Sequence, residues 1–155
     1  MEHEEYMRQA LELARLAMAE GEVPVGCVIV RDGAVVGRGR NRRETAQTAL
    51  GHAELEAIAQ ACRTLGGWRL AGCALYVTLE PCPMCAGAIV NARIPAVYYG
   101  AKDDKAGCCG SVLNLFEERF NHHPRLYRGP LERECQEILQ DFFQGLREDG
   151  AGENG

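Results

Sequence analysis

Two short motifs, far apart in the sequence, limit what this chain can fold into. Residues 52–54 read His-Ala-Glu, and residues 80–85 read Glu-Pro-Cys-Pro-Met-Cys. His52, Cys82 and Cys85 are side chains that bind zinc, and three protein ligands leave a tetrahedral zinc one position short, which is typical of catalytic rather than structural sites. The fold must therefore bring the two motifs together, with the carboxylate of the first motif beside the metal.

The spacing within each motif predicts how it sits on its helix. Cys82 and Cys85 are three residues apart at a helix start, so both sulfurs can face one side, where the helix N-terminus favours thiolates. His52 and Glu54 are two residues apart and would point away from each other within a helix. They converge only if the helix begins at this point, which the stretch 49–51 permits.

The donor set explains why a carboxylate is needed. Two thiolates and a neutral imidazole largely neutralise Zn²⁺, so its water should be acidified less than in a three-histidine site. The nearby carboxylate of Glu54 can take the proton from that water and pass it to a substrate nitrogen. These residues therefore predict hydrolytic attack on an amidine-like carbon, with loss of ammonia.

Each motif taken alone has a plainer interpretation. A Cys-x-x-Cys pair can be a redox pair, a lone histidine in a helix is more often structural, and a lone glutamate is usually solvated surface. A purely structural zinc is normally closed by a fourth protein ligand. The combination of His-x-Glu at one helix start and Pro-Cys-x-x-Cys at another favours a catalytic site over these alternatives.

Hydrophobic periodicity predicts the elements around the motifs. The predicted helices are Tyr6–Glu20, His52–Leu65, Pro83–Ala92 and Leu131–Leu146. The predicted strands are Val23–Val30, Ala34–Val36, Ala74–Leu79 and Ala96–Tyr99, the first two joined in a hairpin by Asp32-Gly33. The hairpin forces antiparallel pairing and the strand–helix–strand crossovers force parallel pairing, so the prediction is an α/β fold with three α/β/α layers and a mixed sheet of about five strands.

Length and composition fit one zinc-dependent domain. The 155 residues are enough for a single core, predicted over residues 1–147, and the Gly-rich, acidic residues 148–155 are predicted to be a disordered tail. No apolar run approaches the length of a membrane span and no secretory leader opens the chain, which predicts a cytoplasmic protein without membrane contact.

The cysteines and the charges leave some questions open. Of the eight cysteines, four are predicted to be small buried hydrophobes, Cys27, Cys62, Cys73 and Cys135, whereas the loop pair Cys108-Cys109 stays ambiguous. The formal charge of −5 argues mildly against a large nucleic-acid surface. The segment Arg38–Arg43 nevertheless holds four arginines, and such a run is more often a solvated face than a phosphate contact.

At these residues the chain resembles the cytidine/deoxycytidylate deaminase superfamily and, within it, the bacterial tRNA-specific adenosine deaminases. The resemblance runs from about Tyr6 to about Leu146. It includes the segments Glu22–Gly26, Leu75–Cys82, Gly107–Asn114, Asn121-His122 and Phe142-Phe143. The zinc motif alone does not select a substrate, and the segments from Gly107 to His122 favour the tRNA branch.

The resemblance implies a cytidine-deaminase-like fold that holds one zinc per chain at His52, Cys82 and Cys85, with Glu54 as the proton shuttle. It also implies that the wobble adenosine of a tRNA anticodon is converted to inosine. Members of the family are homodimers that bind the anticodon stem-loop across both subunits.

The resemblance further implies four substrate contacts. Asn41 would hold the flipped nucleoside, the backbone of Ala53 would contact the base edge, and Val23 would wall the pocket. Asp103 falls in a loop that approaches the nucleotide backbone. Without the resemblance, Asn41 is better explained as a strand-end or turn asparagine.

Two departures from the family pattern and two other functions remain. Thr48–Gly51 stands where many relatives carry Asp-Pro-Thr-Ala, and residues 148–155 are acidic where some relatives are basic. A deaminase of free guanine or cytosine, or of a nucleoside, would share the zinc site and need no basic rim. A zinc-stabilised RNA-binding module would need no catalytic carboxylate, so the presence of Glu54 argues against it.

Overall fold

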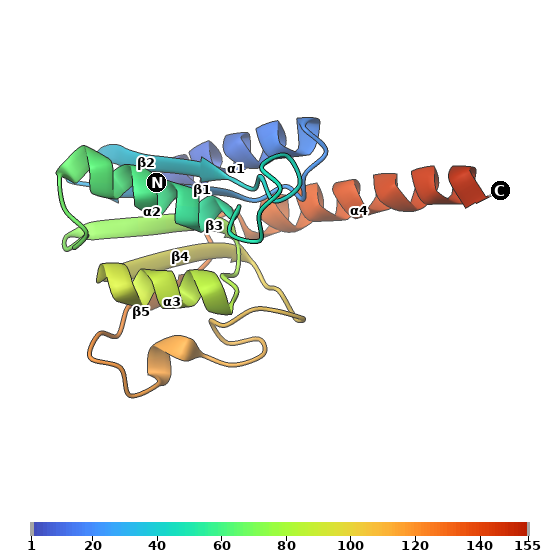
Figure 1. The fold of residues 1–155 in the computed structure, drawn as a ribbon. Coiled ribbons are helices and arrows are strands. Elements are labelled where there is room, and N and C mark those ends of the chain that lie inside the picture. Colours follow the sequence, from blue (N-terminus) through green and yellow to red (C-terminus); the bar gives the residue numbers. More distant parts are fainter. Residues whose placement is uncertain (1, 155) are drawn as a thin grey trace.

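The computed structural model describes residues 2–154, and for residues 149–154 only the backbone. Its elements are α1 (Glu2–Ala19), β1 (Gly26–Arg31), β2 (Ala34–Arg40), α2 (Ala53–Leu65), β3 (Cys73–Leu79), α3 (Pro83–Ala92), β4 (Ala96–Ala101), the short 3₁₀ helix η1 (Leu115–Glu117), β5 (Arg125–Arg128) and α4 (Glu132–Asn154). The strands form one sheet in the order β2-β1-β3-β4-β5 (Figure 1). The predicted α/β fold with a five-stranded sheet is confirmed.

The sheet is mixed, as predicted. β1 pairs antiparallel with both β2 and β3, whereas β3–β4 and β4–β5 are parallel pairs. The β1–β2 turn has Asp32 and Gly33 at φ 50° and 78°, the left-handed pair that a two-residue hairpin needs. Because β2 and β3 both run against β1, they point the same way, and α2 is the crossover between them.

Helices cover both faces of the sheet (Figure 1). Residues of α2 and α3 pack with Cys27 and Ile29 of β1, and residues of α1 and α4 pack with Val28 and Val30 on the opposite face. The alternation of side chains along a strand explains this division. The two layers of core fix the start of α2 and the start of α3 at the same end of the sheet.

Glycines in β2 let α2 lie close to the sheet. A Cβ on Gly37 would lie 2.3 Å from the carbonyl oxygen of Ala57, and one on Gly39 would lie 2.1 Å from that of Ala53. Any larger residue would push the first turns of α2 outward. The position of the start of α2, and of the first motif, therefore depends on the glycines at positions 37 and 39 of β2.

Several predicted boundaries differ from the structure, and one strand was missed. β1 begins at Gly26 rather than Val23, because the residues before it lie outside the sheet, where Glu22, Val23 and Val25 line a pocket. β2 continues to Arg40, and β5 was not predicted as an element, since four residues with arginines at both ends carry too little hydrophobic pattern. The start of β1 and the end of β2 both lie at the pocket end of the sheet, where the strands are joined to loops.

The last helix is longer than predicted. α4 ends at Asn154 rather than Leu146, so residues 148–154 are helical where a disordered tail was expected, and Gly155 lies outside the described residues. No proline interrupts this stretch, and its glycines lower helix propensity without forbidding the helix. Figure 1 shows α4 projecting past the sheet. The domain boundary at residue 147 stays a prediction.

All eight cysteines are free thiols. Cys27, Cys73 and Cys135 are buried and Cys62 is half-buried, in line with the predicted core role, and the pair Cys108-Cys109 is buried as well. Among the described helices, none is both long and apolar enough to cross a bilayer.

Candidate metal centre and active site

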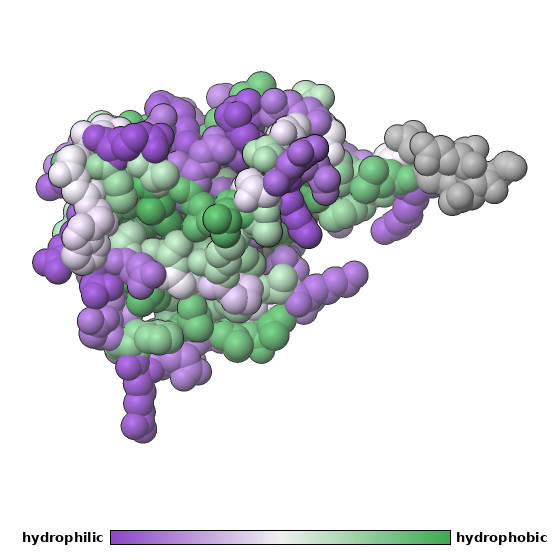
Figure 2. All heavy atoms as spheres, viewed as in Figure 1, coloured by the Kyte–Doolittle hydropathy of each residue, from purple (hydrophilic) through white to green (hydrophobic). Residues whose placement is uncertain are grey.

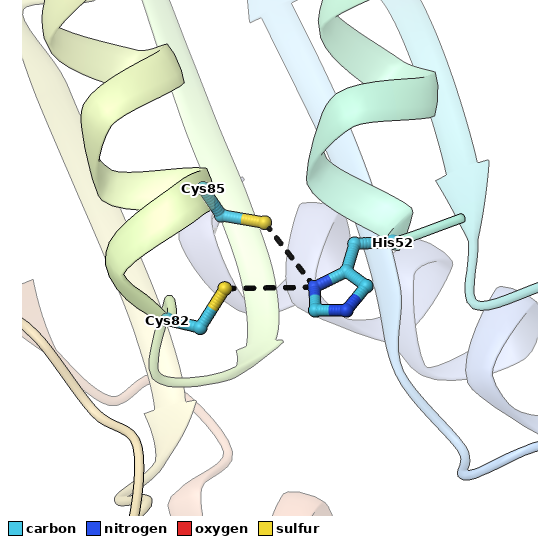
Figure 3. A group of neighbouring side chains, drawn as sticks. All are labelled: His52, Cys82 and Cys85. Atoms are coloured by element: carbon cyan, nitrogen blue, oxygen red, sulfur yellow. Dashed lines mark hydrogen bonds between the residues drawn. The ribbon is translucent and has the colours of Figure 1, made fainter. Parts of the chain in front are cut away.

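The two motifs meet at two helix starts. His52 is the N-cap of α2, with φ −99° and ψ 146°, and Cys82 is the N-cap of α3, with φ −76° and ψ 175°. Neither side chain caps its own helix, so both are free to point toward each other. Pro83 opens α3, where its fixed φ suits the first turn. The two motifs therefore come together as predicted, with His52 facing Cys82 and Cys85 (Figure 3).

The three candidate ligands form a triangle of the size that zinc requires. Nδ1 of His52 lies 3.6 Å from Sγ of Cys82 and 3.5 Å from Sγ of Cys85, and all three atoms lie within 4.8 Å of one another. Zinc–sulfur and zinc–nitrogen bonds of about 2.3 and 2.1 Å at a tetrahedral angle separate the two donor atoms by about 3.5 Å. The two distances from His52 therefore match those of a tetrahedral zinc.

The charges at the triangle suit a cation. The hydrogen bond with Cys85 lowers the pKa of Cys82 to about 4, whereas that hydrogen bond and burial raise the pKa of Cys85. The hydrogen bond with Cys82 raises the pKa of His52. Cys82 is thus the thiol that ionises more readily, and zinc binding would displace the protons that remain on Cys85 and on the His52 nitrogen that ligates the metal.

Glu54 lies in the first turn of α2 and is 4% exposed. Burial raises the pKa of its carboxyl to about 7. The carboxyl lies beside the Cys85 thiol, so it borders the triangle without belonging to it. A carboxyl in this position can both accept and return a proton near neutral pH.

A pocket of about 420 Å³ opens next to the triangle. Its walls include every substrate contact that the resemblance implied, together with three candidate site residues: Val23, Asn41, Ala53, Asp103, His52, Glu54 and Cys82. The far wall comes from α4, through Phe142, Phe143 and Leu146. The site is therefore a partly apolar cavity whose walls include two members of the metal triangle and the carboxyl of Glu54.

Asn41 is both a turn residue and a pocket residue. Its Nδ2 donates to the carbonyl of Val23 over 3.1 Å, and its Oδ1 accepts from the N–H of Arg43 over 3.2 Å. These bonds fix the orientation of the amide, which is 8% exposed and lines the pocket. The turn interpretation and the substrate-contact interpretation are thus compatible.

The other two implied contacts differ in what they offer. Ala53 is the first residue of α2, and the first N–H groups of a helix have no partner within it, so Ala53 presents a backbone donor at the pocket. Asp103 lines the pocket, but its Oδ1 accepts from the N–H groups of Lys105 and Ala106 over 3.1 and 3.2 Å. One oxygen of this carboxylate is therefore used to shape its own loop.

The arginine cluster is not one surface. Arg40 pairs with Glu20 over 2.7 Å and Arg42 pairs with Glu56 over 3.2 Å. Arg43 is exposed and lines the pocket, and no carboxylate pairs with it among the ion pairs of residues 2–154. Of the four arginines, only Arg43 is placed to meet a substrate at the pocket.

Some pocket residues had no predicted role. Glu22 and Glu80 are buried carboxylates at the pocket wall, and their partners lie in loops that periodicity does not describe. The α4 residues Phe142 and Leu146 were predicted to lie in a helix, and Phe142 also belongs to a segment that carries the resemblance, but neither was assigned a role at the pocket. The sequence signal that could have indicated a pocket role is the length of this helix, because the helix continues past the sheet that it covers.

Comparisons with known proteins agree with this geometry. A family model described as MafB19-like deaminase matches residues 1–147. The tRNA-specific adenosine deaminase of Bacillus subtilis is 51% identical over 143 residues, which cover 92% of this chain and 89% of that protein.

Two solved structures extend the comparison. A structure from a study of A-to-I editing by tRNA:A34 deaminases has a TM-score of 0.84 at 46% identity, and the match covers 87% of this chain and 99% of that one. Guanine deaminase from Bacillus subtilis has a TM-score of 0.64 at 35% identity, with coverage of 96% and 95%. The similarity to the tRNA enzymes is therefore greater than the similarity to this free-base deaminase.

Proposed function

The chain belongs to the family of tRNA-specific adenosine deaminases, and on that premise we propose that it converts the wobble adenosine of a tRNA anticodon to inosine. The observation that carries the proposal is the zinc-sized triangle of His52, Cys82 and Cys85 with the buried Glu54 beside it, at the end of a pocket. The greater similarity to a tRNA deaminase than to a guanine deaminase favours the RNA substrate over the free base.

One zinc per chain is the cofactor that this site would hold. His52, Cys82 and Cys85 would be its ligands, because their donor atoms have the spacing of a tetrahedron. When bound, zinc supplies the Lewis acidity that activates water for attack on the adenine ring. The remaining chemistry falls to the protein's own side chains.

Glu54 moves the proton. In hydrolytic deamination the water oxygen bonds to C6 of adenine, the bond from C6 to the exocyclic nitrogen breaks, and ammonia leaves. Glu54 takes a proton from the attacking water and returns it to the departing nitrogen, so the carboxylate is regenerated at the end of the cycle. Its burial beside Cys85, outside the donor triangle, supports this role for Glu54.

The pocket residues would seat the base. Asn41 is held rigidly by Val23 and Arg43 and would bind the nucleoside with its remaining hydrogen-bonding capacity. The free backbone N–H of Ala53 would contact the base edge, and Val23 would wall the cavity. Asp103 would act chiefly through the shape of its loop, because its Oδ1 accepts two bonds within that loop.

The direct test is a competition between substrate classes. The protein is incubated with a tRNA anticodon stem-loop, with free adenosine and with free guanine, and inosine and xanthine are quantified by mass spectrometry. We expect inosine in the RNA and little turnover of the free compounds, because an anticodon loop presents its bases partly unstacked at low cost. Faster turnover of guanine than of the RNA would instead establish the free-base alternative.

A homodimer is the assembly that we propose for RNA binding. Several large apolar side chains are exposed in the loop before α2 and in the segment around η1, which contacts α3, namely Leu50, Val112, Leu113 and Phe120. Figure 2 shows hydrophobic residues among polar ones on the face that carries α2 and α3 in Figure 1. An apolar surface of this kind is typical of a protein interface. Sedimentation velocity tests the proposal, because a chain of 17.0 kDa that sediments only as a monomer at micromolar concentration would contradict it.

Arg43 should contact the RNA backbone. We expect Arg43→Gln to raise KM for the stem-loop ~5-fold and to reduce the salt dependence of binding, since one phosphate contact and its released counterion are lost. Arg38→Gln is the matched control, because Arg38 is an exposed arginine of the same segment that does not line the pocket. Equal salt dependence for both variants and the wild type would show that Arg43 is only solvated surface.

A further inference from the structure

Two buried carboxylates lie at the pocket wall without a part in the proposed chemistry. Glu22 is 1% exposed and Glu80 is 2% exposed, and both line the pocket. Glu22 follows α1, and Glu80 follows β3. A buried carboxylate is costly unless hydrogen bonds replace its water, so the partners of these two residues indicate what they do.

The partners of Glu80 all come from one segment, residues 103–111. Its Oε1 accepts from the Asp103 N–H over 3.1 Å and from the Ser111 hydroxyl over 2.5 Å. Its Oε2 accepts from the N–H groups of Cys109 and Ser111 over 2.9 and 3.1 Å. Each oxygen therefore receives two donors, and the segment folds around the carboxylate.

Gly107 shows how closely this segment wraps. A Cβ at Gly107 would lie 2.3 Å from Cδ of Glu80, so only a residue without a side chain fits there. The next N–H, of Cys108, donates to the carbonyl of Pro81 over 2.8 Å, immediately before Cys82. The same segment carries Asp103 and Ala106 to the pocket wall.

Glu22 likewise accepts hydrogen bonds from backbone N–H groups, here from the segment of residues 41–51. Its Oε1 accepts from the Glu44 N–H over 3.1 Å and its Oε2 accepts from the Thr45 N–H over 2.6 Å. This segment, residues 41–51, carries Asn41, Arg43 and Glu44 at the pocket. The two segments flank one cavity, and both consist of turns and irregular backbone.

We propose that Glu22 and Glu80 are positioning residues, each of which holds one of the two segments that flank the pocket in the shape that admits an RNA loop. This inference rests on the proposed function. Neither segment has a helix or strand to define its shape, so turns within its own backbone and the hydrogen bonds to the carboxylate hold it together. The candidate zinc ligands lie at the starts of α2 and α3, which pack on the sheet through the core. Losing a carboxylate should therefore weaken substrate seating more than the chemical step.

Glu80→Gln and Glu22→Gln test this inference, and each variant is the control for the other. In one orientation the amide nitrogen that Glu80→Gln introduces would face the N–H groups of Cys109 and Ser111, and in the other it would face the N–H of Asp103 and the Ser111 hydroxyl, which can turn and accept. In either case at least one backbone N–H loses its acceptor. Hydrogen exchange should accelerate at the amides of residues 103, 109 and 111 in Glu80→Gln, and at residues 44 and 45 in Glu22→Gln. If a flanking segment is then correctly placed about one tenth of the time, KM for the stem-loop rises about tenfold. kcat and zinc content should stay near those of the wild type.

The outcomes separate positioning from general stability and from the function itself. Unchanged KM with faster local exchange would overturn the inference, and so would faster exchange throughout the domain. Wild-type protein that makes no inosine refutes the proposed function, whereas a wild type that makes inosine and variants that match its KM refute only the positioning role. Should Glu80→Gln fail to fold, Ser111→Ala removes one donor from the same carboxylate. It should raise KM in the same direction by a smaller factor, and an unchanged KM would again overturn the inference.

Discussion

Replacing Glu54 with glutamine should lower kcat for the RNA substrate by about 10²- to 10⁴-fold, the range that proton transfer by a positioned side chain contributes. Glutamine keeps the volume of this side chain, which is 4% exposed, so the pocket should keep its shape. The amide cannot carry the proton from water to the leaving nitrogen. The effect is measured as the single-turnover rate on the stem-loop. The zinc content and the affinity for RNA should remain those of the wild type, because Glu54 is not a metal ligand.

Glu56→Gln is the matched control for this substitution. Glu56 lies in the same turn of α2, but it is half-buried in an ion pair with Arg42 and does not line the pocket. Its loss should leave kcat unchanged within a factor of about two, because partly exposed ion pairs contribute little. Substantial residual activity in Glu54→Gln, or an equal loss in the two variants, would remove Glu54 from its assigned role.

The candidate metal triangle is predictable because its determinants are local. The spacing of Cys82 and Cys85 and the position of His52 before a helix can be recognised in the sequence, and the structure places all three as that pattern requires. The sheet follows for the same reason, since Asp32-Gly33 and the strand–helix–strand order decide which pairings are possible. Only β5, with four residues, is too short to be predicted from its hydrophobic pattern.

The parts that the sequence does not reveal depend on partners distant in the chain. Arg40 and Arg42 belong to an apparent basic cluster until Glu20 and Glu56 neutralise them in three dimensions. Glu80 is one glutamate among many until its oxygens are seen to accept from backbone N–H groups more than twenty residues away. Backbone donors leave no pattern in a sequence, so a carboxylate that organises a loop cannot be told from a solvated one.

Removing one sulfur from the triangle should remove the metal. We expect Cys85→Ser to reduce zinc from one per chain to near zero and to reduce deamination to background. Serine stays protonated at neutral pH and is a poor zinc ligand, so only two protein ligands would remain. Cys85 is completely buried, so the variant should also lose the stability that metal binding gives to the folded state. Metal analysis of purified protein and thermal unfolding measure both effects.

Chelation provides the consistency check, and Cys62→Ser provides the control. A chelator should lower the unfolding temperature of the wild type toward that of Cys85→Ser and should have no further effect on the variant, because ligand that binds only the folded state raises stability by mass action. Cys62 is a half-buried free thiol on α2 outside the triangle, so Cys62→Ser should keep its zinc and respond to chelator like the wild type. Full zinc occupancy in Cys85→Ser would show that the metal is held by other residues. If the chelator leaves the unfolding temperature of the wild type unchanged, metal binding at the triangle does not stabilise the folded state.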